Sequence, residues 1–263
     1  MLGQHRHTEV AGAGAPVVLI HAGICDSRMW DPQRATLTAE HRVLRLDLGG
    51  YGRSPLTPGP LCHAADVLAA MDRHEIDRAT LVGASMGGAV AIDLAVAHPD
   101  RVSALVLVDS ALGGHEWSAE LRAAWDEEEQ AIERGDLDAA VECTLRLWVD
   151  GPSRPAGGAP GDVRKAVATM QRTAYELQLP LDGQVDEVEL VPDAHLRLTE
   201  LTMPALVVDG EHDVPDFHVI ARQLAATLPD SRAVTIAGAA HLPSLEQPEA
   251  FGGALLAFMA KLR

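Results

Sequence analysis

The sequence predicts an α/β fold, with a mostly parallel central sheet flanked by helices. Short runs rich in Val, Leu and Ile recur along the 263 residues, and segments of helical periodicity lie between them. The runs are almost continuously apolar, which is typical of parallel strands whose two faces are both covered by helices. We expect strands at 17–20, 43–47, 79–82, 104–108, 205–208 and 233–236.

Residues 113–202 show no convincing strand. Helical patterns are expected there at 118–134, 137–148 and 162–178. The Pro/Gly-rich segment 151–160 interrupts them, because such a segment fits neither a helix nor a central strand. The strand pattern then resumes. We therefore predict one core domain, made of residues 1–112 and 203–263, with residues 113–202 inserted as a helical lid, or cap.

Composition narrows the classes of partner. The formal net charge of −17 repels phosphate backbones and anionic headgroups, so we expect neither nucleic acid nor a membrane as a partner. The three cysteines show no CxxC spacing, and neither a disulfide framework nor a zinc site is expected. The first seven residues lack the apolar run of a signal peptide. We expect a cytoplasmic protein, either a monomer or a homodimer.

The strongest chemical signal is Gly83-Ala84-Ser85-Met86-Gly87. This GxSxG pattern lies between an expected strand and an apolar helical pattern at 89–97, which is the context of a nucleophile elbow. The N-terminus of that helix offers free N–H groups to a developing oxyanion. The alternative is a glycine-rich turn that binds phosphate.

A serine hydroxyl needs a base, and the base needs an orienting acid. His241 follows the last expected strand in a loop before the C-terminal helix, and Asp213 follows the strand at 205–208. The chain order Ser85, Asp213, His241 is the one that a strand–turn–helix nucleophile predicts. Asp109, at the end of the strand 104–108, competes with Asp213 for the role of the acid.

The oxyanion hole is expected to use two backbone N–H groups. One is that of Met86, next to the nucleophile, and the other, by position, is that of Gly23, in the loop after the first parallel strand. In that loop, His21 is expected to shape the backbone and not to titrate in catalysis.

These motifs together resemble the α/β-hydrolase superfamily, closest to its small cofactor-free esterases, enol-lactonases and C–C hydrolases. The segments that carry the resemblance are 19–23, 47–54, 83–88, 210–213 and 241–249. The resemblance implies Ser85 as nucleophile, His241 as base and Asp213 as acid, with Gly23 and Met86 as oxyanion donors. The chain departs from the family at His21-Ala22-Gly23, where the usual order is His-Gly-bulky. We expect Ala22 to restrict the backbone and Gly23 to widen the acyl side of the pocket.

The pocket is expected to be largely apolar. Its candidate residues are Ile24, Leu112, Trp117, Trp148 and Leu242, of which Trp148 is the aromatic residue most expected near the substrate. Packing between lid helices is the competing role for Trp148. Arg53 and Arg154 are candidates for a substrate carboxylate, against the plainer role of surface arginines.

The function these features predict is a serine esterase that acts on a small, largely apolar ester through an acyl-enzyme on Ser85. No metal or organic cofactor is expected. An enol-lactonase, a C–C bond hydrolase or a perhydrolase would reuse the same triad. A third alternative is a ligand-binding or signalling protein that keeps the triad without turnover.

Overall fold

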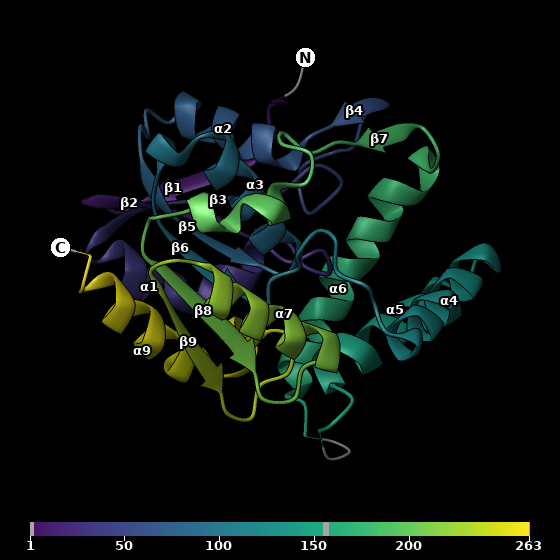
Figure 1. Cartoon of the computed structure of the whole chain (residues 1–263). Helices are drawn as coiled ribbons and strands as arrows, with labels where there is room; N and C mark the ends of the chain where they lie inside the picture. Colours follow the sequence, from purple (N-terminus) through teal and green to yellow (C-terminus); the bar gives the residue numbers. More distant parts are fainter. Residues whose placement is uncertain (1–2, 155–157, 263) are drawn as a thin grey trace.

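Seven strands form the central sheet, in the order β1-β3-β2-β5-β6-β8-β9 (Figure 1). In this computed structural model, which describes residues 3–154 and 158–262, every neighbouring pair in the sheet is parallel except β1 and β3. The strands are β1 (Thr8–Ala11), β2 (Ala15–Ile20), β3 (His41–Leu46), β5 (Ala79–Ala84), β6 (Val102–Val108), β8 (Ala205–Gly210) and β9 (Ser231–Ile236). All six strands expected from the sequence are present, and the predicted α/β fold class is confirmed.

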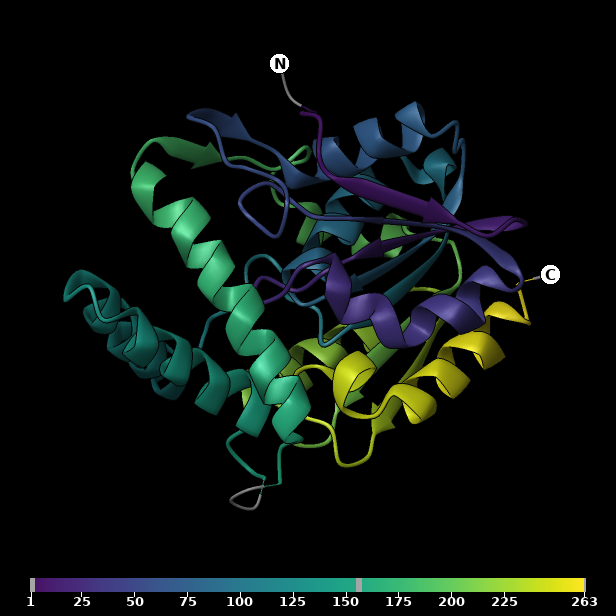
Figure 2. The ribbon, with the colours of Figure 1, turned by 180° about the vertical axis from the view of Figure 1, so that it is seen from behind.

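Helices cover both faces of the sheet. One face carries α2 (His63–Arg73), α3 (Met86–Ala97) and α7 (Pro215–Thr227), and the other carries α1 (Asp31–Thr38) and α9 (Pro248–Met259). Figure 2 shows α1 and α9 in front of the sheet when the molecule is seen from behind. The shorter elements are α8 (Pro243–Glu246) and the 3₁₀ helices η1 (Ser27–Trp30), η2 (Pro99–Arg101), η4 (Leu179–Leu181) and η5 (Ala194–Glu200).

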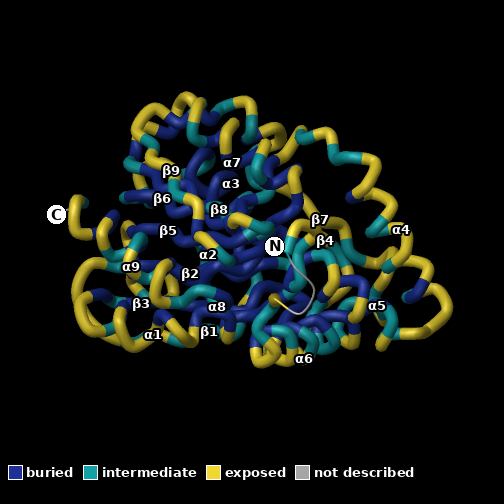
Figure 3. Tube along the Cα trace, turned by 90° about the horizontal axis from the view of Figure 1, so that it is seen from below, coloured by how far each residue is buried: buried dark blue, intermediate teal, exposed yellow. Residues whose placement is uncertain are grey.

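Alternate side chains of each strand enter opposite core layers. On β2, Val18 and Ile20 pack with α2 and α3, while Val17 and Leu19 pack with α1 and α9. Both sets are almost fully buried. Figure 3 shows buried strands at the centre and many exposed residues on the outer helices. This two-sided burial explains why the strand sequences are continuously apolar.

Between β6 and β8 the chain leaves the sheet and forms a helical segment beyond its carboxyl edge (Figure 1). It contains α4 (Ala119–Glu133), α5 (Leu137–Thr144), the π-helical η3 (Leu145–Asp150) and α6 (Gly161–Gln178). The side chains of Ser118 and Asp136 accept hydrogen bonds from the first turns of α4 and α5, so both helices begin at sequence-encoded caps. Residues 155–157 of the predicted Pro/Gly break lie outside the described residues.

Three short strands have no counterpart in the sequence prediction. β1 is a four-residue antiparallel edge strand, while β4 (Gly59–Leu61) and β7 (Val185–Glu187) form a separate parallel pair. The prediction that 113–202 lacks a strand is therefore wrong at β7. Its Val-Asp-Glu sequence has no apolar run, because this strand covers no sheet core. No helix within the described ranges is long and apolar enough to span a bilayer.

The start of α3 approaches the sheet very closely at Gly87. A Cβ atom built there would lie 2.5 Å from the carbonyl oxygen of Ile20 on β2 and 2.6 Å from that of His21. Gly83, on β5, meets the carbonyl oxygen of Gly87 in the same way. Real Cβ atoms do not tolerate such contacts with backbone, so glycine at both positions brings the helix N-terminus against the strand ends.

We expect Gly87→Ala to lower the free energy of unfolding by about 2 kcal/mol or more, because the added methyl group overpacks rigid backbone. The matched control is Gly253→Ala on α9, where nothing lies within 4 Å of an added Cβ. That substitution should raise stability by about 0.5–1 kcal/mol, the helix-propensity difference between the two residues. Urea unfolding measures both changes, and equal stabilities for the two variants would contradict the close packing.

Candidate active site

Ser85 lies in the turn between β5 and α3, in a backbone conformation that residues other than glycine rarely adopt. Its φ is 51° and its ψ is −118°. The turn is held from β6, because the Ser85 amide donates to the Val108 carbonyl oxygen at 2.9 Å and the Ala111 amide donates to the Ser85 carbonyl oxygen at 3.0 Å. A strained serine persists only where its surroundings impose the strain. Because Ser85 directly follows β5, its half-buried side chain lies at the carboxyl edge of the sheet.

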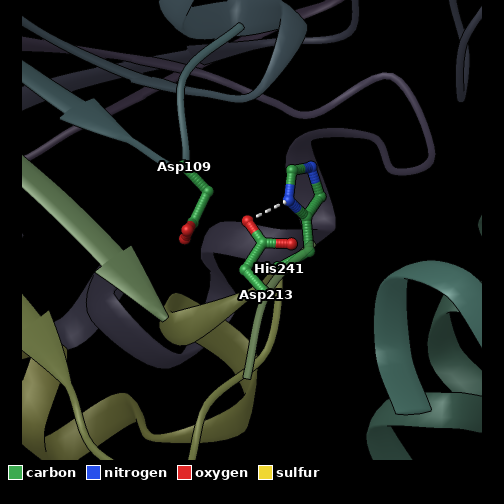
Figure 4. A group of neighbouring side chains, drawn as sticks. All are labelled: Asp109, Asp213 and His241. Atoms are coloured by element: carbon green, nitrogen blue, oxygen red, sulfur yellow. Dashed lines mark hydrogen bonds and ion pairs between the residues drawn. The ribbon is translucent and has the colours of Figure 1, made fainter. Parts of the chain in front are cut away.

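His241 and Asp213 form a buried pair. The Nδ1 atom of His241, in the loop after β9, lies 2.8 Å from Oδ2 of Asp213, in the loop after β8 (Figure 4). Both residues are only 2 % exposed. The other carboxylate oxygen of Asp213 accepts the Val214 amide at 2.7 Å. A proton on Nδ1 leaves Nε2 of the neutral ring as an acceptor, which is the tautomer that a general base requires.

The three residues predicted as a triad share one edge of the sheet, because β5, β8 and β9 are parallel and each residue follows a strand end. The structure brings His241 and Asp213 into direct contact. Within the described residues, the Ser85 hydroxyl forms no hydrogen bond, so its contact with His241 is not made. Catalytic hydrogen bonds often tighten only when substrate is bound.

Asp109 ends β6 beside this pair and is fully buried. Its Oδ1 accepts the Gly210 amide at 2.9 Å, and His241 bonds to Asp213 instead of to this rival acid. One ligand atom from each of these three side chains lies within 4.8 Å of the others, close enough to surround a cation. Both carboxylate oxygens of Asp213 already take part in hydrogen bonds, with His241 and with the Val214 amide, so we interpret the group as a hydrogen-bonded network.

The two expected oxyanion donors lie next to each other. A Cβ atom built on Gly23 would lie 3.7 Å from Cβ of Met86 and 3.6 Å from its Sδ. Met86 opens α3, so its amide has no acceptor within the helix. Gly23 forms no hydrogen bond within the described part of the chain. Among the described residues, neither amide has an acceptor, so both are free to donate.

The unusual Ala22 causes no backbone strain. It is absent from the described non-glycine residues with positive φ, so the restriction expected from the sequence does not arise. Space next to Gly23 is also limited, because the Met86 side chain and the Tyr51 hydroxyl group both lie in contact range of an added Cβ. His21 shapes this loop: its Nδ1 contacts the Ala22 carbonyl oxygen, and its Nε2 accepts the Leu48 amide at 2.9 Å. Burial lowers the pKa of His21, which keeps the ring neutral.

Two aromatic rings enclose His241. The ring centroids of Trp148, on η3, and Phe217, on α7, each lie 4.5 Å from that of the imidazole. The Trp148 carbonyl oxygen also accepts the His241 amide at 3.3 Å. The helical segment between β6 and β8 therefore contacts His241 directly. Phe217 was missed by sequence reasoning, because an apolar residue in the first turn of a helix is usually core.

The other expected pocket residues divide between two environments. Ile24 and Trp117 pack in the same cluster as Trp148 and Phe217, at the edge of the site. Leu112 and Leu242 are buried in the core layers on opposite faces of the sheet. The cavity that reaches Met86 is lined by other residues, and a shared pocket of these five stays a prediction.

A cavity of about 610 Å³ lies between α3 and the β4–β7 pair and reaches the site at Met86. Asp93, Glu187 and the buried His63 also line it. Burial lowers the pKa of His63 to about 3 and raises that of Glu187.

Tyr51 also lies next to Met86, which the sequence did not predict, although Tyr51 belongs to the segment 47–54 that carries the family resemblance. Its hydroxyl lies 3.6 Å from Sδ of Met86, and burial raises its pKa to about 12, so it stays neutral.

Glu246 holds the backbone amides of the two residues that flank His241. Its carboxylate accepts the Ala240 amide at 3.0 Å and the Leu242 amide at 2.9 Å. The same carboxylate pairs with Arg154, and both side chains are almost fully buried. Arg154 is thus neither a surface arginine nor free for substrate. Arg53, the other candidate for a substrate carboxylate, pairs with Glu9.

Glu246→Ala should lower the free energy of unfolding by about 3–5 kcal/mol, because it leaves a buried guanidinium group without its carboxylate partner and two amides without an acceptor. It should also lower turnover, since the His241 loop loses its anchor. Chemical denaturation and steady-state kinetics measure the two effects. The matched control is the exposed Glu249→Ala, three residues on, which should change both by little. Wild-type stability in Glu246→Ala would contradict the anchoring role.

Comparisons with known proteins show the family of this chain. Residues 15–134 match the family described as alpha/beta hydrolase fold. The chain is 31% identical to a pimeloyl-[acyl-carrier protein] methyl ester esterase of Citrobacter koseri, over 94% of both chains. Among solved structures, it resembles a thermophilic esterase from Thermogutta terrifontis (TM-score 0.77, 27% identity, 97% of this chain and 93% of that one). It also resembles the enol-lactonase from Burkholderia xenovorans (TM-score 0.76, 27% identity, 97% and 96%). The chain belongs to the α/β-hydrolase superfamily.

Proposed function

We propose that this protein is a serine hydrolase that cleaves a small, largely apolar carboxylic ester. The observation that carries the proposal is the buried hydrogen bond between His241 and Asp213 at the sheet edge that also bears the strained Ser85. The similarity to esterases over nearly the whole chain supports the same class of reaction.

In the proposed reaction, Ser85 Oγ attacks the ester carbonyl carbon while His241 Nε2 removes its proton. Asp213 stabilises the imidazolium that forms. The amides of Gly23 and Met86 bind the negative oxygen of the tetrahedral intermediate. His241 then returns the proton to the leaving alcohol, and a water molecule activated by His241 releases the acid from Ser85.

We further propose that residues 113–202 act as a lid. Trp148 connects this segment to His241 through both its ring and its carbonyl oxygen. Aromatic rings on two sides of the imidazole exclude water, which strengthens the electrostatic interactions of the site. The cavity beyond Met86 offers space for one end of the substrate.

A lactone is the second candidate substrate. It is a cyclic ester, so the same attack opens the ring without a separate leaving group. The similarity to an enol-lactonase at 27% identity favours this candidate. Turnover of simple lactones beside p-nitrophenyl esters distinguishes the two.

Ser85→Ala should reduce hydrolysis of p-nitrophenyl esters by at least about 10⁴-fold, because no other group can form the acyl-enzyme. A fluorophosphonate probe should add its mass to Ser85 of the wild type, detected by peptide mass spectrometry. The variant gives the matched control for labelling. Equal activity in the two proteins would refute the nucleophile assignment.

Asp213→Asn should lower kcat/KM by about 10³–10⁴-fold, because the amide disfavours the His241 tautomer that accepts the serine proton. Asp209→Asn is the control. Asp209 ends β8 nearby but bonds to His218 and Thr235, so its loss should leave activity near the wild-type value. Near-normal activity in Asp213→Asn, with a severe loss in Asp109→Asn, would reverse the assignment of the acid.

A further inference from the structure

Asp109 has an unsatisfied oxygen in a place where water does not reach. Oδ1 accepts the Gly210 amide, but Oδ2 is buried and has no hydrogen-bond donor among the described residues. An ionised carboxylate can only accept hydrogen bonds, and a buried one without donors is costly. Figure 4 shows the Asp109 carboxyl group beside that of Asp213, and one oxygen of each lies within 4.8 Å of the other.

The two carboxyl groups face each other under unequal conditions. Asp213 receives hydrogen bonds on both oxygens, from the Val214 amide and from His241. Asp109 receives one, from Gly210. Donors stabilise the charged form, so a single proton shared by this pair belongs on Asp109.

We propose that Asp109 is a positioning residue that carries a proton on Oδ2 and donates it in a hydrogen bond to the carboxylate of Asp213. The proton satisfies the orphaned oxygen and gives Asp213 a third hydrogen bond. Asp213 is then held on both sides, by Asp109 from the end of β6 and by His241 from the loop after β9. This inference rests on the proposed role of Asp213 as the acid.

The surrounding charges agree with a protonated Asp109. Burial, followed by the negative charge of Asp213, raises its pKa well above the usual range. The groups that face it are Asp213 after β8, His241 after β9 and Asp209 at the end of β8, which is itself bonded to His218. The carboxylates among these groups disfavour a further negative charge.

The backbone at this position suits one conservative variant. Asp109 has a φ of 40°, a conformation in which asparagine is tolerated far better than most residues. Asparagine can also accept from Gly210 with its oxygen and donate to Asp213 with its nitrogen. Asp109→Asn therefore copies the protonated acid without its titration, while Asp109→Ala removes the donor.

Activity is the first test. Asp109→Asn should keep kcat/KM at pH 7 within about threefold of the wild type, and Asp109→Ala should lose about tenfold or more, as expected when one positioning hydrogen bond is removed. At alkaline pH the wild type should lose activity as Asp109 ionises beside Asp213, and Asp109→Asn should not. Asp66→Asn, which changes a buried aspartate on α2 paired with Arg6, should leave this pH profile unchanged.

Stability is the second test and needs no turnover. In the folded protein Asp109 keeps its proton, whereas in the unfolded chain it ionises above about pH 4. The folded state then binds more protons, so wild-type stability falls relative to Asp109→Asn as the pH rises from 4 towards the folded pKa. Urea unfolding measures the free energy of unfolding of both proteins. The value for Asp109→Asn minus that for the wild type should be larger at pH 8 than at pH 4.

A stability difference between the wild type and Asp109→Asn that does not change with pH would overturn the proposal. Wild-type activity in Asp109→Ala would also overturn it, and so would an equally large loss of activity in Asp109→Asn and Asp109→Ala. If Asp109→Ala does not fold, the pH profile of activity and the urea unfolding of Asp109→Asn still test the proposal. Fluorophosphonate labelling of Ser85 tests the proposed function separately. If Ser85 is not labelled, the stability measurement still tests the protonation of Asp109.

Discussion

The site depends on the close approach of the α3 N-terminus to the strand ends. Gly87 lets the first turn of the helix lie against the backbone carbonyl groups of Ile20 and His21, and Gly83 allows the same contact from β5. This approach leaves no room for a relaxed turn, so Ser85 takes a positive φ and is fixed by bonds from the β6 side. It also places the free amide of Met86 beside Gly23. One steric constraint thus positions both the hydroxyl group and the two proposed oxyanion donors.

Around this turn, buried carboxylates hold His241, the proposed base. Asp213 bonds to the His241 ring, Glu246 holds the amides of both neighbouring residues, and Asp109 lies against Asp213. Each carboxylate is removed from water, so each must find donors within the protein. Trp148 closes the arrangement from the helical segment. His241 is therefore held by both the core and the helical segment between β6 and β8, which couples the geometry of the site to the packing of that segment.

Much of this was predictable because the relevant signals are local. Apolar runs identified the six main strands, and the elbow motif located Ser85 between a strand and a helix. Parallel strands bring their ends to one edge, which is why Asp213 and His241 could be paired from residues 28 apart. The short polar strand β7 lacked any such signal, and so did Phe217, whose contact with His241 depends on how α7 packs.

The strand positions, the elbow motif and the candidate base follow from periodicity and chain order, which a sequence contains in full. The partners of individual polar groups do not, since they depend on side chains that meet only after folding. Arg154 illustrates this, because the sequence suggested a surface or substrate-binding arginine and the fold buries it against Glu246. Ser85 shows both cases. Its motif predicted a nucleophile, but its strained φ and the free amides beside it arise from packing of α3 on the sheet.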